Sequence, residues 1–210
     1  MGAGGFAREV LDVVHAINQA QPDDPPWEPL GFVADEPPAD PRPFEAIGMS
    51  WLGAVDDYLD RDSLSFAVGV GDGSDRLLLA DRCSALGHEP ATLIHPQAAI
   101  STGTEINTGS VVCAFVGTMP DVSVGKFCVL NLHVTVGAGC LIGDGVTINP
   151  GAHLGDNISI GHRVMVGTGA FISSNLAVGS AAAIGAGAVV KHDVPGDVTV
   201  MGVPAHARMN

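Results

Sequence analysis

Hydrophobic residues recur at every sixth position through the second half of the chain. Steps of six from Ile94 to Val190 give seventeen positions, and all of them except Thr118 are isoleucine, leucine or valine. In the last third, the position four residues later is small or apolar as well, as at Ala152 and Val164. A period of six matches neither the 3.6-residue period of a helix nor the two-residue alternation of a half-buried strand. Two inward positions in every six residues predict a short, flat strand followed by a corner.

Three such strands close a triangular coil, and successive coils stack about 4.8 Å apart, the usual spacing of paired strands. Glycine follows the repeating aliphatic residue at Gly125, Gly137, Gly143, Gly155, Gly161, Gly167, Gly179 and Gly185. A side chain at these positions would crowd the neighbouring backbone, and the same glycines would cost a helix about 1 kcal/mol each. We therefore predict a parallel β-helix of nearly six coils over residues 93–210, ending in a C-terminal tail.

Residues 1–92 follow a different pattern and predict a separate domain. An apolar-periodic helix begins among glycines at Gly2, Gly4 and Gly5 and runs to about Ile17. Strands are expected over 30–35 and 64–70, a second helix over 75–86, and loops rich in Pro and Asp over 21–29 and 35–43. Alternating strands and helices predict a small α/β domain of Rossmann-like type.

The glycines at the start of the first helix have two interpretations. The N–H groups of a first helical turn, with the positive end of the helix dipole, bind phosphate well, but the same glycines suit a plain helix start. A nucleotide-binding glycine fingerprint follows a strand, whereas only Met1 precedes Gly2. We therefore expect the first strand to be missing from the fold, or the start of the chain to have been assigned too late.

The chain is strongly acidic. Its 9 Lys and Arg against 23 Asp and Glu give a formal net charge of −14, which repels phosphate backbones, and no cluster of basic and aromatic residues opposes that field. Nucleic acid is therefore excluded as a partner. The uncharged run 164–190 is long enough to cross a bilayer, but its glycines and polar residues argue against a membrane span.

The four cysteines are Cys83, Cys113, Cys128 and Cys140. They form no CxxC pair and no zinc-ligand spacing, and nothing at the N-terminus has the pattern of a secretory signal. Reduced thiols in a cytoplasmic protein are the expected state. Cys128 and Cys140 fall on the inward phase of the repeat and are expected to be buried and unreactive.

Five motifs follow one another in an order typical of one family. They are Gly2-Ala3-Gly4-Gly5-Phe6-Ala7-Arg8-Glu9-Val10, Gly31-Phe32-Val33-Ala34-Asp35, Ile94-His95-Pro96 before the repeats, Gly187-Ala188-Val189-Val190-Lys191 and Gly202-Val203-Pro204-Ala205. This order resembles the sialic acid O-acetyltransferase-type (NeuD-type) sugar acyltransferases, which are hexapeptide-repeat transferases. The resemblance implies a left-handed β-helix, a homotrimer, and acyl transfer from acetyl-CoA to an amino or hydroxyl group of a nucleotide-linked or acidic sugar.

The resemblance also assigns binding residues. Acetyl-CoA is expected along the later coils, near Gly155, Thr168 and Ala186. The nucleotide part of the sugar substrate is expected at the N-terminal domain, near the residues Gly2, Gly4, Gly5 and Asp35. Because the chain is so acidic, these anionic ligands are expected to be held more by backbone N–H groups than by cations.

The chain departs from the family where its catalytic histidines are expected. The general base of the family sits in a His-Asp or His-Glu pair, which is Ala138-Gly139 here, and a second histidine falls at Thr147. His133, five residues before Ala138, is our candidate catalytic residue, and the simpler interpretation is a solvated or interface histidine with no role in the chemistry. The alternative function is therefore a catalytically silent trimeric relative that binds a ligand or acts as a scaffold.

A zinc hydratase of the γ-carbonic anhydrase type is a third hypothesis, because that class places histidines on a similar β-helix. His133, His153 and His162 are separated by twenty and nine residues. That spacing does not match the ligand pattern of the class. The sequence therefore predicts no metal site.

Overall fold

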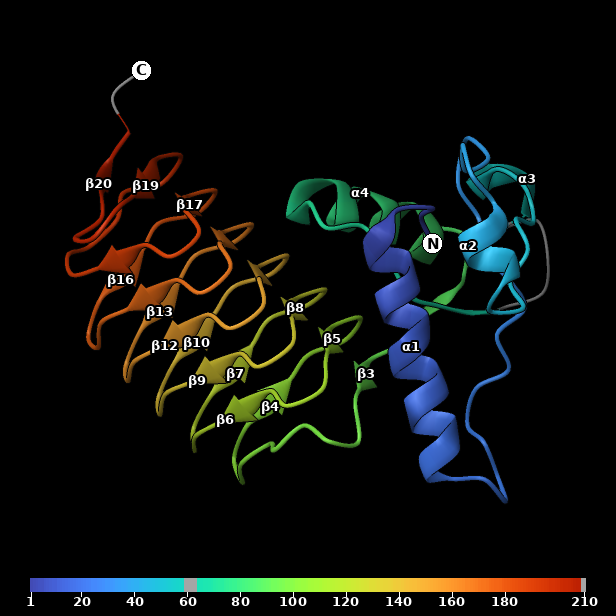
Figure 1. Ribbon diagram of the computed structural model, residues 1–210, viewed down its shortest axis with the longest axis horizontal. Helices are drawn as coiled ribbons and strands as arrows, with labels where there is room; N and C mark the ends of the chain where they lie inside the picture. The colour runs from blue at the N-terminus through green and yellow to red at the C-terminus, as the bar shows by residue number, and fades with distance from the viewer. Residues whose placement is uncertain (59–63, 209–210) are drawn as a thin grey trace.

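The computed structural model describes residues 1–58 and 64–208 and shows a β-helix beside a helical N-terminal segment (Figure 1). The helices are α1 (Gly5–Ala20), α2 (Arg42–Glu45), α3 (Val55–Tyr58) and α4 (Gly73–Ser84). The strands of the N-terminal segment are β1 (Ser65–Phe66) and β2 (Glu89–Pro90). Those of the β-helix are β3 (Leu93–Ile94), β4 (Glu105–Ile106), β5 (Val111–Val112), β6 (Gly117–Thr118), β7 (Ser123–Val124), β8 (Val129–Leu130), β9 (Thr135–Val136), β10 (Leu141–Ile142), β11 (Thr147–Ile148), β12 (His153–Leu154), β13 (Ser159–Ile160), β14 (Met165–Val166), β15 (Phe171–Ile172), β16 (Ala177–Val178), β17 (Ala183–Ile184), β18 (Val189–Val190), β19 (Thr199–Met201) and β20 (His206–Ala207).

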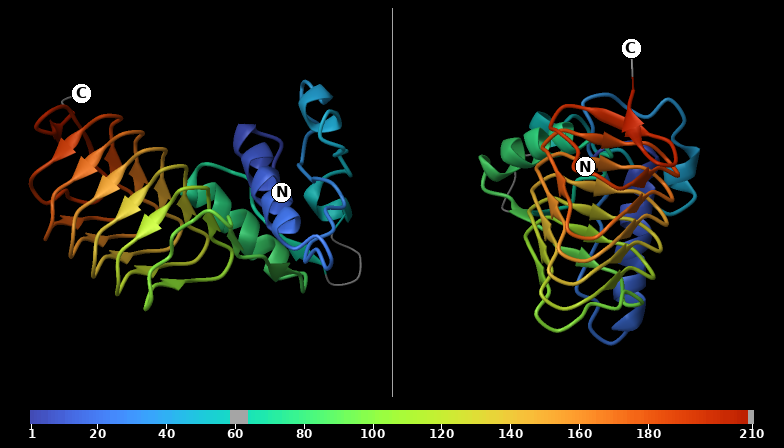
Figure 2. Two further views of the ribbon diagram at one scale, coloured as in Figure 1. Left: turned by 60° about the horizontal axis from the view of Figure 1, so that its bottom comes forward. Right: turned by 90° about the vertical axis from the view of Figure 1, so that its left-hand side faces the viewer.

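The β-helix has three faces, each a sheet made of every third strand, and its coils stack along one axis (Figure 2). The β4 face holds β4, β7, β10, β13 and β16, and the β6 face holds β6, β9, β12, β15 and β18. The β3 face holds β3, β5, β8, β11, β14, β17, β19 and β20. Strands pair in parallel with a register of one coil, as Ile142 does with Val124 on one side and Ile160 on the other. The six-residue period is therefore confirmed as a parallel β-helix.

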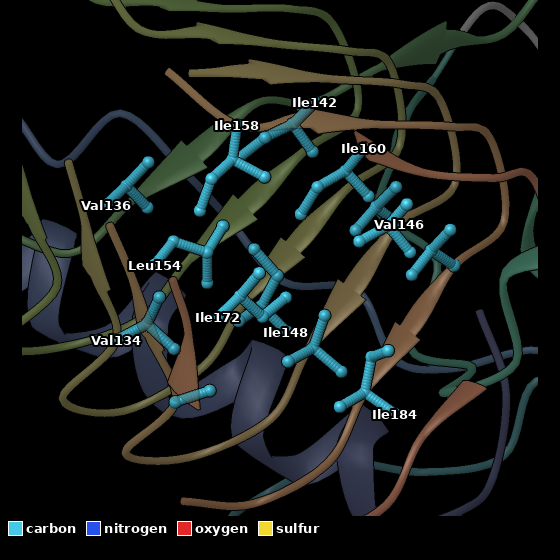
Figure 3. Close-up of a cluster of buried hydrophobic side chains, with 14 of the residues drawn as sticks. Val134, Val136, Ile142, Val146, Ile148, Leu154, Ile158, Ile160, Ile172 and Ile184 are labelled. Atoms are coloured by element: carbon cyan, nitrogen blue, oxygen red, sulfur yellow. The ribbon is translucent and has the colours of Figure 1, made fainter. Parts of the chain in front are cut away.

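The repeating aliphatic residues point inward and form one continuous core (Figure 3). Leu130, Ile148 and Ile172 are fully buried, and Cys128 and Cys140 are buried among them as expected. Burial raises the pKa of the Cys128 thiol to about 12, so this thiol stays protonated and unreactive at neutral pH. The uncharged run 164–190 forms β14 to β18, and no helix in the described part of the chain is long and apolar enough to cross a bilayer.

The turns between faces form three edges, which we name by one residue each. The Thr168 edge (113–116, 131–134, 149–152, 167–170 and 185–188) joins the β3 face to the β6 face. The Gly155 edge (119–122, 137–140, 155–158 and 173–176) joins the β6 face to the β4 face. The His162 edge (125–128, 143–146, 161–164 and 179–182) joins the β4 face to the β3 face.

Side chains connect the coils along the His162 edge. The N–H of Lys126 donates to Asp144 Oδ1 over 2.8 Å, and the N–H of Asp144 donates to His162 Nδ1 over 2.9 Å. The N–H of His162 in turn donates to Ser180 Oγ over 3.1 Å. The His162 ring therefore has a structural role, as an acceptor for a turn N–H that would otherwise lack a partner.

The N-terminal segment contains both predicted helices but only short pieces of the predicted strands. Phe32 forms an isolated parallel bridge with Trp51, and β1 pairs in parallel with β2. Between these two pieces lie Met1 and Gly2, which hydrogen bond to Val33 on one side and to residues 67–69 on the other. Met1 and Gly2 do not form a strand. The Rossmann-like domain over residues 1–92 therefore stays a prediction.

Arg76 joins the N-terminal segment to the β-helix. This α4 residue is 1% exposed, and its guanidinium donates to the carbonyl oxygens of Phe127 at 2.7 Å and Gly145 at 3.0 Å in the β-helix. The same group donates to Val70 O at 2.8 Å and to Thr147 Oγ1 at 2.9 Å. Burial lowers the pKa of Arg76 to about 10, so it remains charged at neutral pH.

Replacing Arg76 by Met should lower Tm by about 5–15 °C, because several buried carbonyls lose their donor while the side-chain volume is kept. Each buried polar group without a partner costs about 1–3 kcal/mol, and 1 kcal/mol shifts Tm by about 2–4 °C in a chain of this size. The matched control is Arg82→Met in the same helix, which removes the exposed ion pairs to Asp35 and Asp56. Such pairs contribute about 0–1 kcal/mol. Equal thermal shifts in the two variants would contradict the role of Arg76.

Candidate functional site

The amino end of α1 is open. Its N-cap, Gly4, has no side chain with which to cap the helix, and the first turn, which is fully described, holds no acidic residue. Gly4 and Gly5 are exposed, and no described atom outside their immediate surroundings lies within 4 Å of where a Cβ would stand. The first N–H groups of a helix have no partners inside it and carry the positive end of its dipole. This end of α1 therefore presents N–H donors to an anion.

The structure places Gly2 and Asp35 near this end. The N–H of Gly2 donates to Val33 O over 2.9 Å, and Asp35 follows Val33 by two residues. Gly2 has φ +103°, and a Cβ there would stand 2.9 Å from Gly69 O, so glycine is required. Asp35 is paired with Arg82 at 3.1 Å, and the hydrogen bond from Arg82 lowers the pKa of Asp35. The three predicted glycines thus come together, and the predicted acid already has a partner.

His133, Thr168 and Ala186 share the Thr168 edge. Thr168 and Ala186 lie one coil apart, with Thr168 O accepting from the N–H of Gly187 at 2.8 Å. In the described part of the chain, the N–H groups of Thr168 and Ala186 donate no hydrogen bond. His133 lies two coils earlier, about 10 Å along the axis, and its exposed ring stacks on Phe115 with centroids 4.9 Å apart. This edge therefore offers free backbone donors and one imidazole.

Gly155 lies on a different edge, together with Ala138 and Gly139 one coil before it. The N–H of Gly155 donates to Ile172 O over 2.9 Å. The N–H of Ala138 donates to Asp156 Oδ1 over 2.9 Å. The backbone donors at Gly155 and Ala138 are therefore used to join coils, in contrast to those of Thr168 and Ala186.

The β6 face separates these two edges. One side of the triangle is six residues long, at most about 20 Å, and its outward row includes Thr135, His153 and Phe171. Thr135 Oγ1 and His153 Nδ1 are hydrogen bonded at 2.8 Å. Within one chain, His133 therefore does not lie beside Ala138. A ligand that contacts both edges of a single chain must lie across this face.

Thr147 is part of the junction around Arg76. It is 5% exposed, donates through Oγ1 to Gly71 O at 2.9 Å and accepts from Arg76 at 2.9 Å. The sequence analysis missed Arg76, because arginine is seldom fully buried. The position of Arg76 just before three leucines in α4 was the one feature of the sequence that could have indicated its burial. Among residues 1–58 and 64–208, no group of three or more His, Cys, Asp or Glu is arranged to hold a metal ion.

A family model matches one part of the β-helix, and several solved structures are similar over nearly the whole chain. Residues 139–174 match the family described as bacterial transferase hexapeptide (six repeats). The acetyltransferase domain of PglB from Neisseria gonorrhoeae, solved with acetyl coenzyme A, is 31% identical with a TM-score of 0.86, covering 99% of this chain and 96% of that one. The chain belongs to the hexapeptide-repeat sugar acyltransferases.

Two more solved structures have the same architecture. A variant of perosamine N-acetyltransferase from Caulobacter crescentus, in complex with CoA and GDP-perosamine, is 25% identical with a TM-score of 0.87, covering 100% of this chain and 95% of that one. WeeI from Acinetobacter baumannii is 28% identical with a TM-score of 0.86, covering 99% and 97%. No curated protein sequence matches the chain significantly.

Ala138 and Thr147, the two positions at which the resemblance leads us to expect histidines, lie in different surroundings. Ala138 lies at a half-buried edge whose backbone is intact. Thr147 lies in the buried junction, where its hydroxyl has two partners. Ala138 is therefore on an accessible edge of the β-helix, whereas Thr147 is part of the packing between the N-terminal segment and the β-helix.

Proposed function

We propose that this protein transfers an acetyl group from acetyl-CoA to an amino or hydroxyl group of a nucleotide-linked sugar. The observation that carries the proposal is the similarity, over nearly all of this chain, to perosamine N-acetyltransferase solved with CoA and GDP-perosamine and to the acetyltransferase domain of PglB solved with acetyl coenzyme A. An amino group is the favoured acceptor, because the perosamine enzyme is an N-acetyltransferase. The hydroxyl acceptor of the NeuD-type enzymes is the other candidate.

In this proposal the two parts of the chain divide the ligands. The segment 1–92 binds the nucleotide-sugar, with its phosphates at the open end of α1 and its sugar directed toward the β-helix. Residues 93–210 bind acetyl-CoA, with the free N–H groups of Thr168 and Ala186 as donors. Backbone donors suit these anionic ligands in a chain with a net charge of −14, since they attract phosphate without requiring cationic side chains.

The positions of the donor-binding residues support a homotrimer, and the resemblance to the family implies that its β-helices are left-handed. Gly155 lies on one edge, and Thr168 and Ala186 lie on another. A CoA molecule that touches all three fits between the Gly155 edge of one copy and the Thr168 edge of the next. In a three-fold ring, each copy contributes its Gly155 edge to one interface and its Thr168 edge to the other. This arrangement brings His133 of one copy toward Ala138 of its neighbour.

The proposed chemistry is direct attack. The acceptor amine adds to the thioester carbonyl carbon, the carbon–sulfur bond of the resulting tetrahedral species breaks, and the CoA thiolate leaves. Ala138 cannot take the amine proton, so His133 from the neighbouring copy is the proposed base. A neutral amine can add to the carbonyl without a base, and the proton that the resulting ammonium must lose can pass to the leaving thiolate or to water, so a low rate is expected to persist even without His133.

A catalytically silent, ligand-binding trimer is the second candidate. The observation that favours it is the loss of both expected imidazoles, with Thr147 committed to the junction through two hydrogen bonds. Such a protein keeps its binding surfaces and its assembly, and it lacks turnover. The experiments below separate the two candidates.

Acetyl-CoA should bind with a micromolar Kd at one site per chain, because the Thr168 edge is exposed and its donors are free. Calorimetric titration measures this without any choice of acceptor. Ala186→Glu should weaken binding at least tenfold, since it places a carboxylate beside the donor. Ala177→Glu, an exposed alanine on the β4 face, is the matched control and should leave Kd within twofold. Absence of binding to the unchanged protein would contradict a donor site.

Gly4→Asp should weaken nucleotide binding at least tenfold and leave Tm unchanged or slightly higher. An N-cap carboxylate satisfies the open N–H groups of α1 and repels phosphate, and Asp differs from Gly there by only a few tenths of a kcal/mol. GDP, UDP and dTDP serve as probes, titrated one at a time. Gly4→Ser is the uncharged control, with an intermediate effect. If the Asp variant bound these nucleotides as tightly as the unchanged protein, the phosphates would not lie at α1.

Restoring the family pair by Ala138→His with Gly139→Asp should raise acetyl transfer to amino-sugar acceptors about 10²–10⁴-fold, the usual contribution of a positioned base. Gly139 has φ 67°, and the equivalent residues Asp121 and Asn157 have φ 60° and 53°, so non-glycine residues occupy this turn conformation in other coils. A Cβ at Gly139 would stand 2.6 Å from Asn157 Oδ1, so the Asn157 side chain must move in the restored variant. His133→Asn in the unchanged protein is the second measurement. A tenfold or greater loss identifies His133 as the working base. Turnover only in the restored variant identifies the natural protein as silent.

A further inference from the structure

One position of the Thr168 edge, where the backbone has a left-handed φ, changes from aromatic residues to glycine along the β-helix. Phe115 and His133 occupy this position in the first two turns of the edge, with φ 60° and 59°. Gly151, Gly169 and Gly187 occupy it in the next three turns, with φ between 65° and 67°. The edge therefore carries aromatic side chains at one end and no side chain at this position toward the other.

Packing within the chain does not account for these three glycines. At each of them, no described atom beyond the glycine and its chain neighbours lies within 4 Å of where a Cβ would stand. At Gly155, by contrast, a Cβ would stand 2.5 Å from Ser174 Oγ. A left-handed φ disfavours residues with a side chain, but Phe115 and His133 adopt it on this same edge. The glycines therefore leave open space along the outside of the edge.

The preceding position on the edge changes in the same way. It holds Leu132, which is 42% exposed, and then Pro150, Thr168 and Ala186 in successive coils. In the described part of the chain, the N–H groups of Thr168 and Ala186 donate no hydrogen bond. We call the large side chains of Phe115, Leu132 and His133 the ring step. The free donors thus lie on the open part of the edge, and the ring step ends that part.

The ring step is held in place by its own contacts. The Phe115 and His133 rings stack with centroids 4.9 Å apart and an angle of 15° between their planes. Stacked rings at this separation attract each other beyond the effect of their buried area. Phe115 is nevertheless 51% exposed, so much of its ring faces outward. A ligand that follows the edge from Ala186 past Thr168 meets His133 first and Phe115 one coil later.

We propose that Phe115 closes the acyl end of the donor site and restricts the donor to short acyl groups such as acetyl. This inference rests on the proposed function, which places acetyl-CoA along Thr168 and Ala186 and the base at His133. The thioester then lies level with His133, and Phe115 lies about 4.8 Å further along the axis. A short acyl group ends before the Phe115 ring, whereas a longer chain that continues in the same direction meets it.

The test measures binding of CoA, acetyl-CoA and hexanoyl-CoA to the full chain by calorimetric titration. The variant is Phe115→Ala, and alanine suits this backbone because Ala181 has φ 57° at the equivalent position of the His162 edge. The matched control is Leu141→Ala, which removes an apolar side chain of similar exposure from the β4 face. CoA carries no acyl group, so its Kd reports on the donor site alone.

The unchanged protein should bind hexanoyl-CoA at least about tenfold more weakly than acetyl-CoA, the lower end of what a pocket achieves against extra methylenes. Phe115→Ala should bring the two Kd values within about threefold and leave the Kd of CoA within about twofold. Leu141→Ala should keep the tenfold difference. As a second variant, Gly151→Phe adds a ring one coil closer to Thr168 and should weaken binding of acetyl-CoA at least about tenfold.

Equal binding of hexanoyl-CoA and acetyl-CoA to the unchanged protein would overturn the role of Phe115, and so would a difference that persists in Phe115→Ala or disappears in Leu141→Ala. Unaltered acetyl-CoA binding by Gly151→Phe would overturn it as well, since the donor would then not follow this edge. In these cases CoA still binds, and the proposed function stands. Absence of CoA binding to the unchanged protein would instead remove the donor site, and this inference with it.

Discussion

Backbone hydrogen bonds between successive coils are the constraint on which the rest of this structure depends. The N–H of Leu141 donates to Ile158 O at 2.8 Å, and the N–H of Gly143 donates to Ile160 O at 2.8 Å. The same step repeats from coil to coil, so residues eighteen positions apart lie directly over one another. This repeat aligns equivalent residues of successive coils. It therefore places the inward aliphatic residues in rows, brings the connected side chains of the His162 edge together, and aligns the exposed donors of the Thr168 edge.

The β-helix was predictable from the sequence, and the N-terminal sheet was not, for physical reasons. The inward aliphatic residues must recur with the period of the fold, so their spacing between Ile94 and Val190 indicates that period directly. The expected strands over 30–35 and 64–70 depend on a partner between them. Met1 and Gly2 lie between them without forming a strand, and the flanking segments form only an isolated bridge and a two-residue strand.

The candidate site was predictable only in part. The glycines at α1 were identified correctly as an open helix end, because this property depends on local sequence alone. To predict that Gly155 lies on one edge and that Thr168 and Ala186 lie on another, the corners of each coil had to be located in the sequence. To predict the role of Arg76, the contact between α4 and the β-helix had to be known. The burial of Arg76 also contradicts the usual preference of arginine for the surface. Features that depend on which elements meet leave little trace in a single sequence.

The coil repeat also limits how this chain can change length. One residue added within a coil would turn every later aliphatic side chain of that coil from the core to the surface, and it would separate turn pairs such as Asp144 and His162. A whole added coil would preserve every row, since it restores each residue to its place over the equivalent residue below. The β-helix can therefore lengthen or shorten gradually only at its ends, and elsewhere only in complete turns.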